Sequence, residues 1–321
     1  MVVRITVVVA CLLAVAGLAL APRGGTTAPP APAAKATRVL LGAYVSPDGR
    51  HWAESGVTAL EQTLGRGLAI DHRFKHWADP FPTAADAWDH AHDRTPMITW
   101  EPDTTSLDAI ASGADDGVLR ARAEAVARDG RPLFLRFAHE MNADWYPWGG
   151  ARASAPGTQD GPERYVAAWR HVHAVFVADG ATNVRWVWSP NHRSIPAAAW
   201  NDAARYYPGD DVVDWIGVDG YDRPSARPAT FASLFDPVLS TFAGRKPLMV
   251  AETATDRRDR ARAGRFVDDV RRAIDAGTPH VDAIVWFDTA KHGHDWRIKG
   301  SDASADAFRL LARDPRLVQV R

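Results

Sequence analysis

Two glutamates placed at the ends of apolar segments could do acid–base chemistry. Glu140 follows the apolar residues 133–138 after a single histidine, and Glu252 follows residues 247–251 directly. A carboxylate at the end of a buried strand loses its hydration, which is costly unless it has a partner or a catalytic task. Hydrolysis of a glycosidic bond requires such a pair, because one carboxyl group protonates the leaving oxygen while the other attacks the anomeric carbon or activates water. For either glutamate alone, a salt-bridged strand end with Arg136 as the partner is the competing interpretation.

The elements that must position these glutamates alternate regularly along the chain. Eight short apolar segments are expected to be strands, namely residues 39–45, 68–74, 97–100, 133–138, 184–188, 213–218, 248–251 and 283–287. Amphipathic stretches expected to be helices lie between them, including residues 84–92, 115–128, 162–178, 230–242 and 259–276. Near-continuous apolar runs are typical of strands buried on both faces, so the pattern predicts an α/β fold, a (β/α)8 TIM barrel with a single catalytic domain. A doubly wound sheet is the rival fold, but residues 41–44 lack the glycine-rich turn that usually follows its first strand.

Barrel enzymes carry their chemistry at the C-terminal ends of the strands. Polar and aromatic residues gather at the expected strand ends: Trp100, Glu101, His139, Glu140, Asn191, Asp219, Tyr221, Asp222, Glu252, Trp286 and Asp288. We therefore expect one rim of the barrel to form the site. The acids Glu101, Asp219, Asp222 and Asp288 lie in stretches that resemble turns and hydrogen-bonded loop ends, so we interpret them as substrate contacts or structural acids.

The segments around this rim resemble glycoside hydrolase family 26, a family of β-mannanases with some mixed-linkage β-glucanases and β-xylanases. The likeness covers nearly all of residues 38–315, and it is carried by residues 136–149 (RFAHEMNADWYPWG), 207–221, 246–252 and 285–288. The family belongs to a clan of barrels that place the acid/base after strand 4 and the nucleophile after strand 7. The resemblance therefore implies a retaining mechanism with Glu140 as general acid/base and Glu252 as nucleophile.

The resemblance also implies substrate-binding residues: His139, Trp145, Trp148, Tyr221 and Trp286. Trp100 and Asn191 complete the expected substrate-binding set because they lie at the ends of predicted strands. In this set His139 is expected to contact the sugar 2-hydroxyl and the nucleophile, and Tyr221 to donate its hydroxyl to Glu252. Trp286 is expected to form the floor of the subsite for the cleaved sugar, and Trp145 and Trp148 to wall the cleft.

The implied substrate is a neutral polysaccharide, with β-mannan first and mixed-linkage β-glucan or β-xylan as alternatives. Many mannanases of the family carry Gly where this chain has Ala143, so the reaction class is better supported than mannan itself.

Composition narrows the classes of partner. The chain has 38 Lys plus Arg against 39 Asp plus Glu, so it has no basic field to hold nucleic acid. Its thirteen Trp exceed the needs of one core, and flat aromatic faces stack on sugar rings. The only cysteine, Cys11, lies near the N-terminus, which excludes a disulfide or cysteine-based metal site in the remainder. We expect no metal and no cofactor, and a monomer.

The N-terminal residues resemble a targeting segment. A basic start at Arg4 precedes an apolar run over residues 5–20 and a small-residue ending, as in a secretory signal peptide, and a Pro/Ala-rich linker follows. We therefore divide the chain into residues 1–36, signal peptide and linker, and residues 37–321, the catalytic domain. The protein is expected to be secreted, without a membrane in its mature form unless the leader is retained as a cell-surface anchor.

Two other classes of protein remain open at this point. A carbohydrate-binding barrel that had lost catalysis would keep its aromatic residues and lose a carboxylate, whereas both glutamates are present. A metal-dependent hydrolase or deacetylase would need His and Asp ligands on several strand ends, and only His139 and His192 are histidine candidates.

Overall fold

The computed structural model describes residues 38–318 apart from 50, 278–279, 292 and 301–302. These residues belong to a compact unit that spans Thr37–Arg321. The predicted signal peptide and linker, residues 1–36, lie outside the described part of the chain. Within that part, no helix has both the length and the apolar character needed to cross a bilayer.

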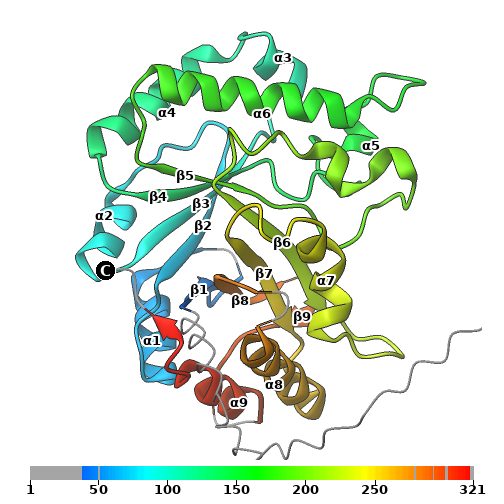
Figure 1. Ribbon diagram of the computed structural model, residues 1–321. Coiled ribbons are helices and arrows are strands. Elements are labelled where there is room, and N and C mark those ends of the chain that lie inside the picture. Colours follow the sequence, from blue (N-terminus) through cyan, green and yellow to red (C-terminus); the bar gives the residue numbers. More distant parts are fainter. Residues whose placement is uncertain (1–37, 50, 278–279, 292, 301–302, 319–321) are drawn as a thin grey trace, which may run out of the picture. The chain divides into compact units, whose positions relative to one another are not determined.

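Eight parallel strands close into a barrel (Figure 1). They are β1 (Val39–Ser46), β2 (Ile70–His76), β3 (Thr95–Glu101), β4 (Leu133–Phe137), β5 (Val184–Trp188), β6 (Trp215–Asp222), β7 (Leu248–Thr255) and β8 (Ala283–Lys291). Each strand pairs with the next, and β1 pairs with β8 from Leu40 opposite Ala283 to Ser46 opposite Thr289. The predicted (β/α)8 barrel is therefore confirmed. Two short strands extend the sheet: β9 (His294–Asp295) runs antiparallel to β8, and β10 (Leu317–Val318) pairs with the start of β1.

The helices lie outside the ring of strands (Figure 1). They are α1 (Glu54–Leu64), α2 (Ala84–Ala91), α3 (Leu107–Ala111), α4 (Asp116–Asp129), α5 (Gly150–Ala153), α6 (Gly161–Ala178), α7 (Phe231–Thr241), α8 (Arg260–Ala276) and α9 (Ala303–Ala312), with two 3-10 turns at Ala199–Asn201 and Ala203–Tyr206. Five of them match the expected helical ranges to within a residue. The N-cap expected at Thr83 is present as a capping box with Asp86.

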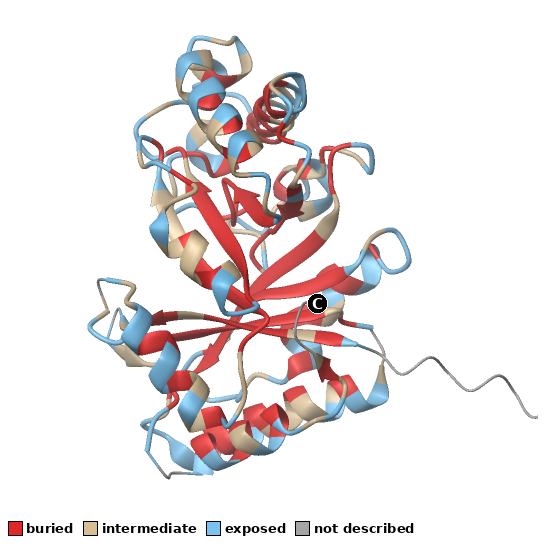
Figure 2. Ribbon diagram, turned by 90° about the vertical axis from the view of Figure 1, so that its left-hand side faces the viewer, coloured by how far each residue is buried: buried red, intermediate tan, exposed pale blue. Residues whose placement is uncertain are grey.

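The strands are buried on both faces, as Figure 2 shows by their colour. Apolar side chains fill the inside of the barrel: Ala69, Ile70, Met97, Phe134, Val187, Met249, Ala251, Ala283 and Val285. A larger apolar layer, which includes Trp100, Trp169, Phe235 and Phe308, packs the outside of the strands against the helices. This double burial is the physical reason for the continuous apolar runs in the sequence.

A register shift in β7 decides where its glutamate points. Val218 of β6 lies opposite Val250, but the next residue, Asp219, lies opposite Glu252, so Ala251 is an extra residue in β7. Side chains alternate between the two faces of a regular strand. Met249 and Ala251 both belong to the inner layer, so Glu252 would otherwise face the helices. The bulge returns Glu252 to the inside of the barrel.

Candidate active site

A fully buried arginine forms the base of the site. Arg136, on β4, donates from Nη1 to both oxygens of Asp219 at 2.8 and 2.9 Å and from Nε to Thr99 Oγ1 at 2.7 Å. Its other amino group, Nη2, donates to Glu252. Burial raises the pKa of Asp219 well above its ordinary value, while the charge of Arg136 opposes that rise. The arginine thus compensates two carboxylates that could not otherwise remain buried.

Glu252 is held by a donor on each oxygen. Oε1 accepts from Arg136 and Oε2 accepts from the hydroxyl of Tyr221, on β6. Glu252 is 4% exposed, so these two donors replace water around the carboxylate. The contact with Tyr221 has the form that the resemblance implied. A carboxylate oriented by a cation and a hydroxyl is suited to nucleophilic attack.

Glu140, just after β4, has a different environment. Oε1 accepts from Asn191 Nδ2 at 2.7 Å, and Oε2 accepts from the indole nitrogen of Trp145 at 2.8 Å. Burial and, second, the charge of Glu252 raise the pKa of Glu140 to about 7. Two carboxyl groups with such different environments can divide the roles of acid/base and nucleophile between them.

The chain turns sharply to present Glu140. Ala138 and Glu140 have φ values of 46° and 53°, a left-handed conformation that residues with a Cβ rarely adopt and that costs about 1–3 kcal/mol each. Hydrogen bonds hold the turn: the Glu140 amide donates to Ser189 O at 2.8 Å, and Trp148 Nε1 donates to His139 O at 2.7 Å. Strain that the surroundings maintain in this way is typical of functional positions.

His139 lies beside the nucleophile. It is 1% exposed, and its ring makes no hydrogen bond to any residue that the structure describes. Burial and then Arg136 lower its pKa well below the ordinary value, so the ring is neutral. One ligand atom each of His139, Asp219 and Glu252 lie within 4.8 Å of one another, which is the spacing of a metal site. Arg136 already donates to both carboxylates, so a divalent cation there would have to compete with a fixed positive charge.

Two of the predicted tryptophans lie beside Glu140. Trp145 is 41% exposed and contacts the acid directly, as a wall of the cleft would. Trp148 is buried beneath Tyr146, whose ring stacks on it at 4.4 Å, so Trp148 supports the wall rather than lining it. Asn191 also lies at the site, through its bond to Glu140.

Two other predicted tryptophans are elsewhere, and their expected position on the rim needs correction. Trp100 is fully buried and stacks on Trp77 at 4.3 Å in the layer between strands and helices. Trp286 packs against Phe308 of α9 at 4.7 Å in the same outer layer. Both sit at strand positions whose side chains face outward, because alternate residues of a strand point to opposite faces. The expected floor of the subsite is therefore not formed by Trp286.

The inward-facing aromatic residues at this position were not singled out from the sequence. Phe287, the neighbour of Trp286, stacks on Tyr44 at 4.7 Å and lies 5.7 Å from Tyr221. Trp296, just beyond β9, stacks on Tyr221 at 4.9 Å, and its buried indole nitrogen has no partner among the described residues. The alternation of β8 could have indicated Phe287. Trp296 depends on the β8–β9 hairpin, which no sequence signal predicted.

The rival acids have separate environments. Asp222 binds Arg262 and Thr255 on the outside of β6, so it is structural. Asp288 accepts a hydrogen bond from the backbone of Ile298, and burial raises its pKa to about 7. Glu101, at the end of β3, also has a pKa raised to about 7 by burial and lies within reach of the charge of Glu252.

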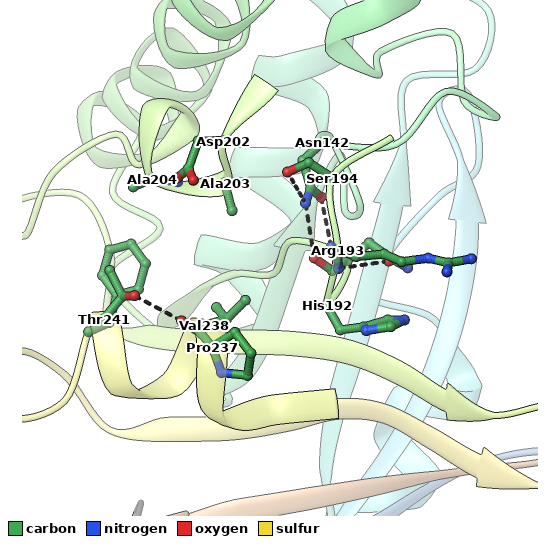
Figure 3. Close-up of a pocket in the computed structure, with 12 residues that line it drawn as sticks. Asn142, His192, Arg193, Ser194, Asp202, Ala203, Ala204, Pro237, Val238 and Thr241 are labelled. Atoms are coloured by element: carbon green, nitrogen blue, oxygen red, sulfur yellow. Dashed lines mark hydrogen bonds between the residues drawn. The ribbon is translucent and has the colours of Figure 1, made fainter. Parts of the chain in front are cut away.

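A cavity of about 190 Å³ lies between the segment after β5 and helix α7 (Figure 3). Its lining includes Asn142, Asn191 and His192 on one side and Pro237 and Thr241 on the other. Neither Glu140 nor Glu252 lines it, so it is a neighbour of the candidate site and not the site itself.

Comparison with known proteins shows the family and the fold. The model described as glycosyl hydrolase family 26 matches residues 45–304. Endoglucanase H of Acetivibrio thermocellus is 31% identical over 277 residues, which cover 84% of this chain and 30% of that protein. The mannan endo-1,4-beta-mannosidase A and B of Caldalkalibacillus mannanilyticus is 30% identical over 117 residues, which cover 36% of this chain and 20% of that protein. The chain thus spans less than a third of the length of these curated relatives.

The structure of a beta-mannanase from Bacteroides ovatus superposes with a TM-score of 0.67 at 18% identity, covering 88% of this chain and 91% of that one, and so shares the fold. The family match extends over most of the barrel, and this chain belongs to glycosyl hydrolase family 26.

Proposed function

We propose that this chain is a secreted retaining β-glycanase that cleaves internal β-1,4 linkages of a polysaccharide, with β-mannan as its substrate. The observation that carries this proposal is the contrast between its two buried glutamates. Glu252 is oriented by Arg136 and Tyr221, whereas Glu140 has a pKa of about 7 and so can exchange a proton near neutral pH.

The proposed reaction has two displacement steps. In the first, the carboxylate of Glu252 attacks the anomeric carbon and forms an ester, while Glu140 gives its proton to the departing glycosidic oxygen. In the second, Glu140 removes a proton from water, whose oxygen attacks the same carbon and releases Glu252. Each step inverts the anomeric centre, so the product retains the original configuration, and both glutamates end in their starting forms.

Several features support an internal attack on a neutral polymer. Trp145 exposes its ring beside the acid, where it can stack on a sugar, and the names of several relatives contain mannan endo-1,4-beta-mannosidase. A relative matched over 84% of this chain is instead named Endoglucanase H, which makes a β-glucan the second candidate. The basic and apolar leader is the basis for proposing secretion, to be tested by finding the mature protein in the culture medium and sequencing its N-terminus.

The two roles can be separated with a substrate that has a good aryl leaving group. Glu140→Ala should still form the glycosyl-enzyme, because such a leaving group needs little protonation, and added azide should give a glycosyl azide of retained configuration. Glu252→Ala should form no such intermediate. Glu163→Gln is a matched control, because Glu163 is an exposed glutamate paired with Arg205 on the outside of the barrel. A loss of only a few-fold in both active-site variants would refute the assignment.

The substrate class can be tested by measuring reducing ends released from mannan, glucomannan, mixed-linkage glucan and xylan, with EDTA present. We expect the fastest release from mannan and a fall in viscosity early in the reaction, as internal cleavage gives. Release confined to the glucan would support the second candidate. Binding without release would indicate a carbohydrate-binding barrel, and loss of activity in EDTA would indicate a metal-dependent enzyme.

A further inference from the structure

Both carboxyl oxygens of Glu140 accept a hydrogen bond from a neighbouring side chain. Asn191 donates to one oxygen and Trp145 to the other. Donors to both oxygens favour the ionised form of a carboxyl group, which is the form needed to act as a base. The first step of the proposed mechanism needs the protonated form. The acid role is therefore favoured when one of the two donors withdraws.

The two donors differ in how firmly they are held. Asn191 is 5% exposed, and its backbone exchanges hydrogen bonds of 2.8 and 2.9 Å with the side chain of Asn142. Its own Oδ1 accepts from the amide of Arg193. Asn191 is thus fixed in place on the segment after β5.

Trp145 is held less closely than Asn191. The residue is 41% exposed, its aromatic contact among the described residues is a distant edge contact with Tyr146 at 6.5 Å, and its indole N–H bonds Glu140. The backbone around it is anchored, since the Gly149 amide donates to Tyr146 O at 3.0 Å and the Gly150 amide to Met141 O at 2.8 Å. A side-chain rotation of Trp145 would therefore leave the loop unchanged.

We propose that Trp145 is a positioning residue that alternates with the leaving sugar: its indole N–H holds Glu140 as a base when that side of the cleft is empty and turns away when the sugar enters. This inference rests on the proposed function. The entering sugar can take over contact with the ring face, while the freed oxygen of Glu140 carries the proton to the glycosidic oxygen. When the leaving sugar departs, Trp145 returns and favours the carboxylate that must activate water.

The charges around Glu140 also change its pKa during the catalytic cycle, and they lower it at the step that needs a base. Glu252 on β7 raises the pKa of Glu140, and Arg136 on β4 lowers it. Asp219 and Tyr221 on β6 and Tyr146 on the loop are the other titratable groups that interact with Glu140. In the glycosyl-enzyme Glu252 is an ester without charge, so the pKa of Glu140 falls when a base is needed. The returning Trp145 adds to that fall.

The test compares Trp145→Phe with the unchanged enzyme over a range of pH. Phenylalanine keeps an aromatic face and removes the N–H. The alkaline limb of the pH profile of kcat/KM reports Glu140 in the free enzyme, so the midpoint of that limb should shift upward by about one pH unit. With an activated aryl glycoside, turnover is limited by breakdown of the intermediate. The midpoint of the acidic limb of kcat against pH should then shift upward by a similar amount. Trp88→Phe is the matched control, because Trp88 is half-buried on α2, outside the barrel.

A second variant separates this role from simple stacking. Trp145→Ala removes both the face and the N–H, so it should show the same shifts of the limbs together with a raised KM for polysaccharide. Limbs that stay in place in both variants would overturn the inference, even if KM rises. Azide rescue of Glu140→Ala distinguishes a failure of this inference from a failure of the proposed function. If rescue occurs and the limbs do not move, only the role of Trp145 is wrong. If rescue fails, the proposed function is wrong as well.

Discussion

The raised pKa of Glu140 predicts that this residue destabilises the fold at neutral and alkaline pH. The group binds a proton up to about pH 7 when folded, against 4.5 as its ordinary value. Because the folded pKa lies above the unfolded one, its contribution to stability is fully present below pH 4.5 and is lost as the pH rises through 7. At 1.36 kcal/mol per unit, the loss is about 3 kcal/mol. Glu140 is 6% exposed, so little of this is screened by solvent.

Glu140→Gln should therefore make the protein more stable while it abolishes the proposed acid catalysis. The amide has the same shape and no charge, but it can accept from only one of the two donors, which costs about 1 kcal/mol. The net gain at pH 8 should be about 2 kcal/mol, which raises Tm by a few degrees in a domain of this size. At pH 4 the gain should give way to a loss of about 1 kcal/mol, because the glutamate is then largely neutral in both the folded and the unfolded protein and only the cost of the lost hydrogen bond remains.

The assay is thermal or urea unfolding of both proteins at pH 4, 6 and 8, with Glu163→Gln as the control for loss of one exposed carboxylate. A stabilisation of equal size at every pH would refute the reasoning, since it would not come from the charge of Glu140. The same conclusion would follow if the control variant gained as much at pH 8.

Three further predictions concern the packing around the site. Arg136→Met should lower the free energy of unfolding by about 3–5 kcal/mol in urea titrations, because it leaves two buried carboxylates without their cation; a neutral effect would contradict this account of the buried network. Gly150→Ala should destabilise the fold and weaken activity, because the added Cβ would overlap the hydroxyl of Tyr206, and adding Tyr206→Phe should recover part of the loss in Tm. Trp100→Phe should lower Tm without changing KM, because Trp100 faces outward, whereas Phe287→Ala should raise KM, because Phe287 faces inward. Steady-state kinetics with the reverse pattern would show that the two faces are assigned wrongly.

The number and order of the strands could be predicted from the sequence because each strand is buried on both faces. An apolar run of five to eight residues between amphipathic stretches indicates a strand buried on both faces. β5 agrees with its expected bounds, and α6 begins one residue earlier than expected. Helices α1, α3, α5 and α9 were not among the predicted ranges, since they lie at the ends of the pattern or in loops.

The candidate site was predictable only as a set of strand ends. Chain position brings Glu140, Asn191, Tyr221 and Glu252 to one rim. The structure joins them as two hydrogen-bonded pairs, Asn191 with Glu140 and Tyr221 with Glu252. Their chemical roles remain a proposal. The resemblance indicated a substrate contact for His139, but the buried arginine network beside it has no local signal, because its partners come from separate strands.

The sequence by itself determined the barrel and the rim, since hydrophobic periodicity and the polar residues that end each strand are local properties. The direction of each side chain was decided by the tertiary structure. One extra residue in β7 turns Glu252 inward, and regular alternation turns Trp100 and Trp286 outward. A shift of one residue exchanges the two faces of a strand, and register depends on pairing with neighbours far along the chain. For that reason the sequence could place these residues along their strands, but only the packed barrel could assign them to the cleft or to the core.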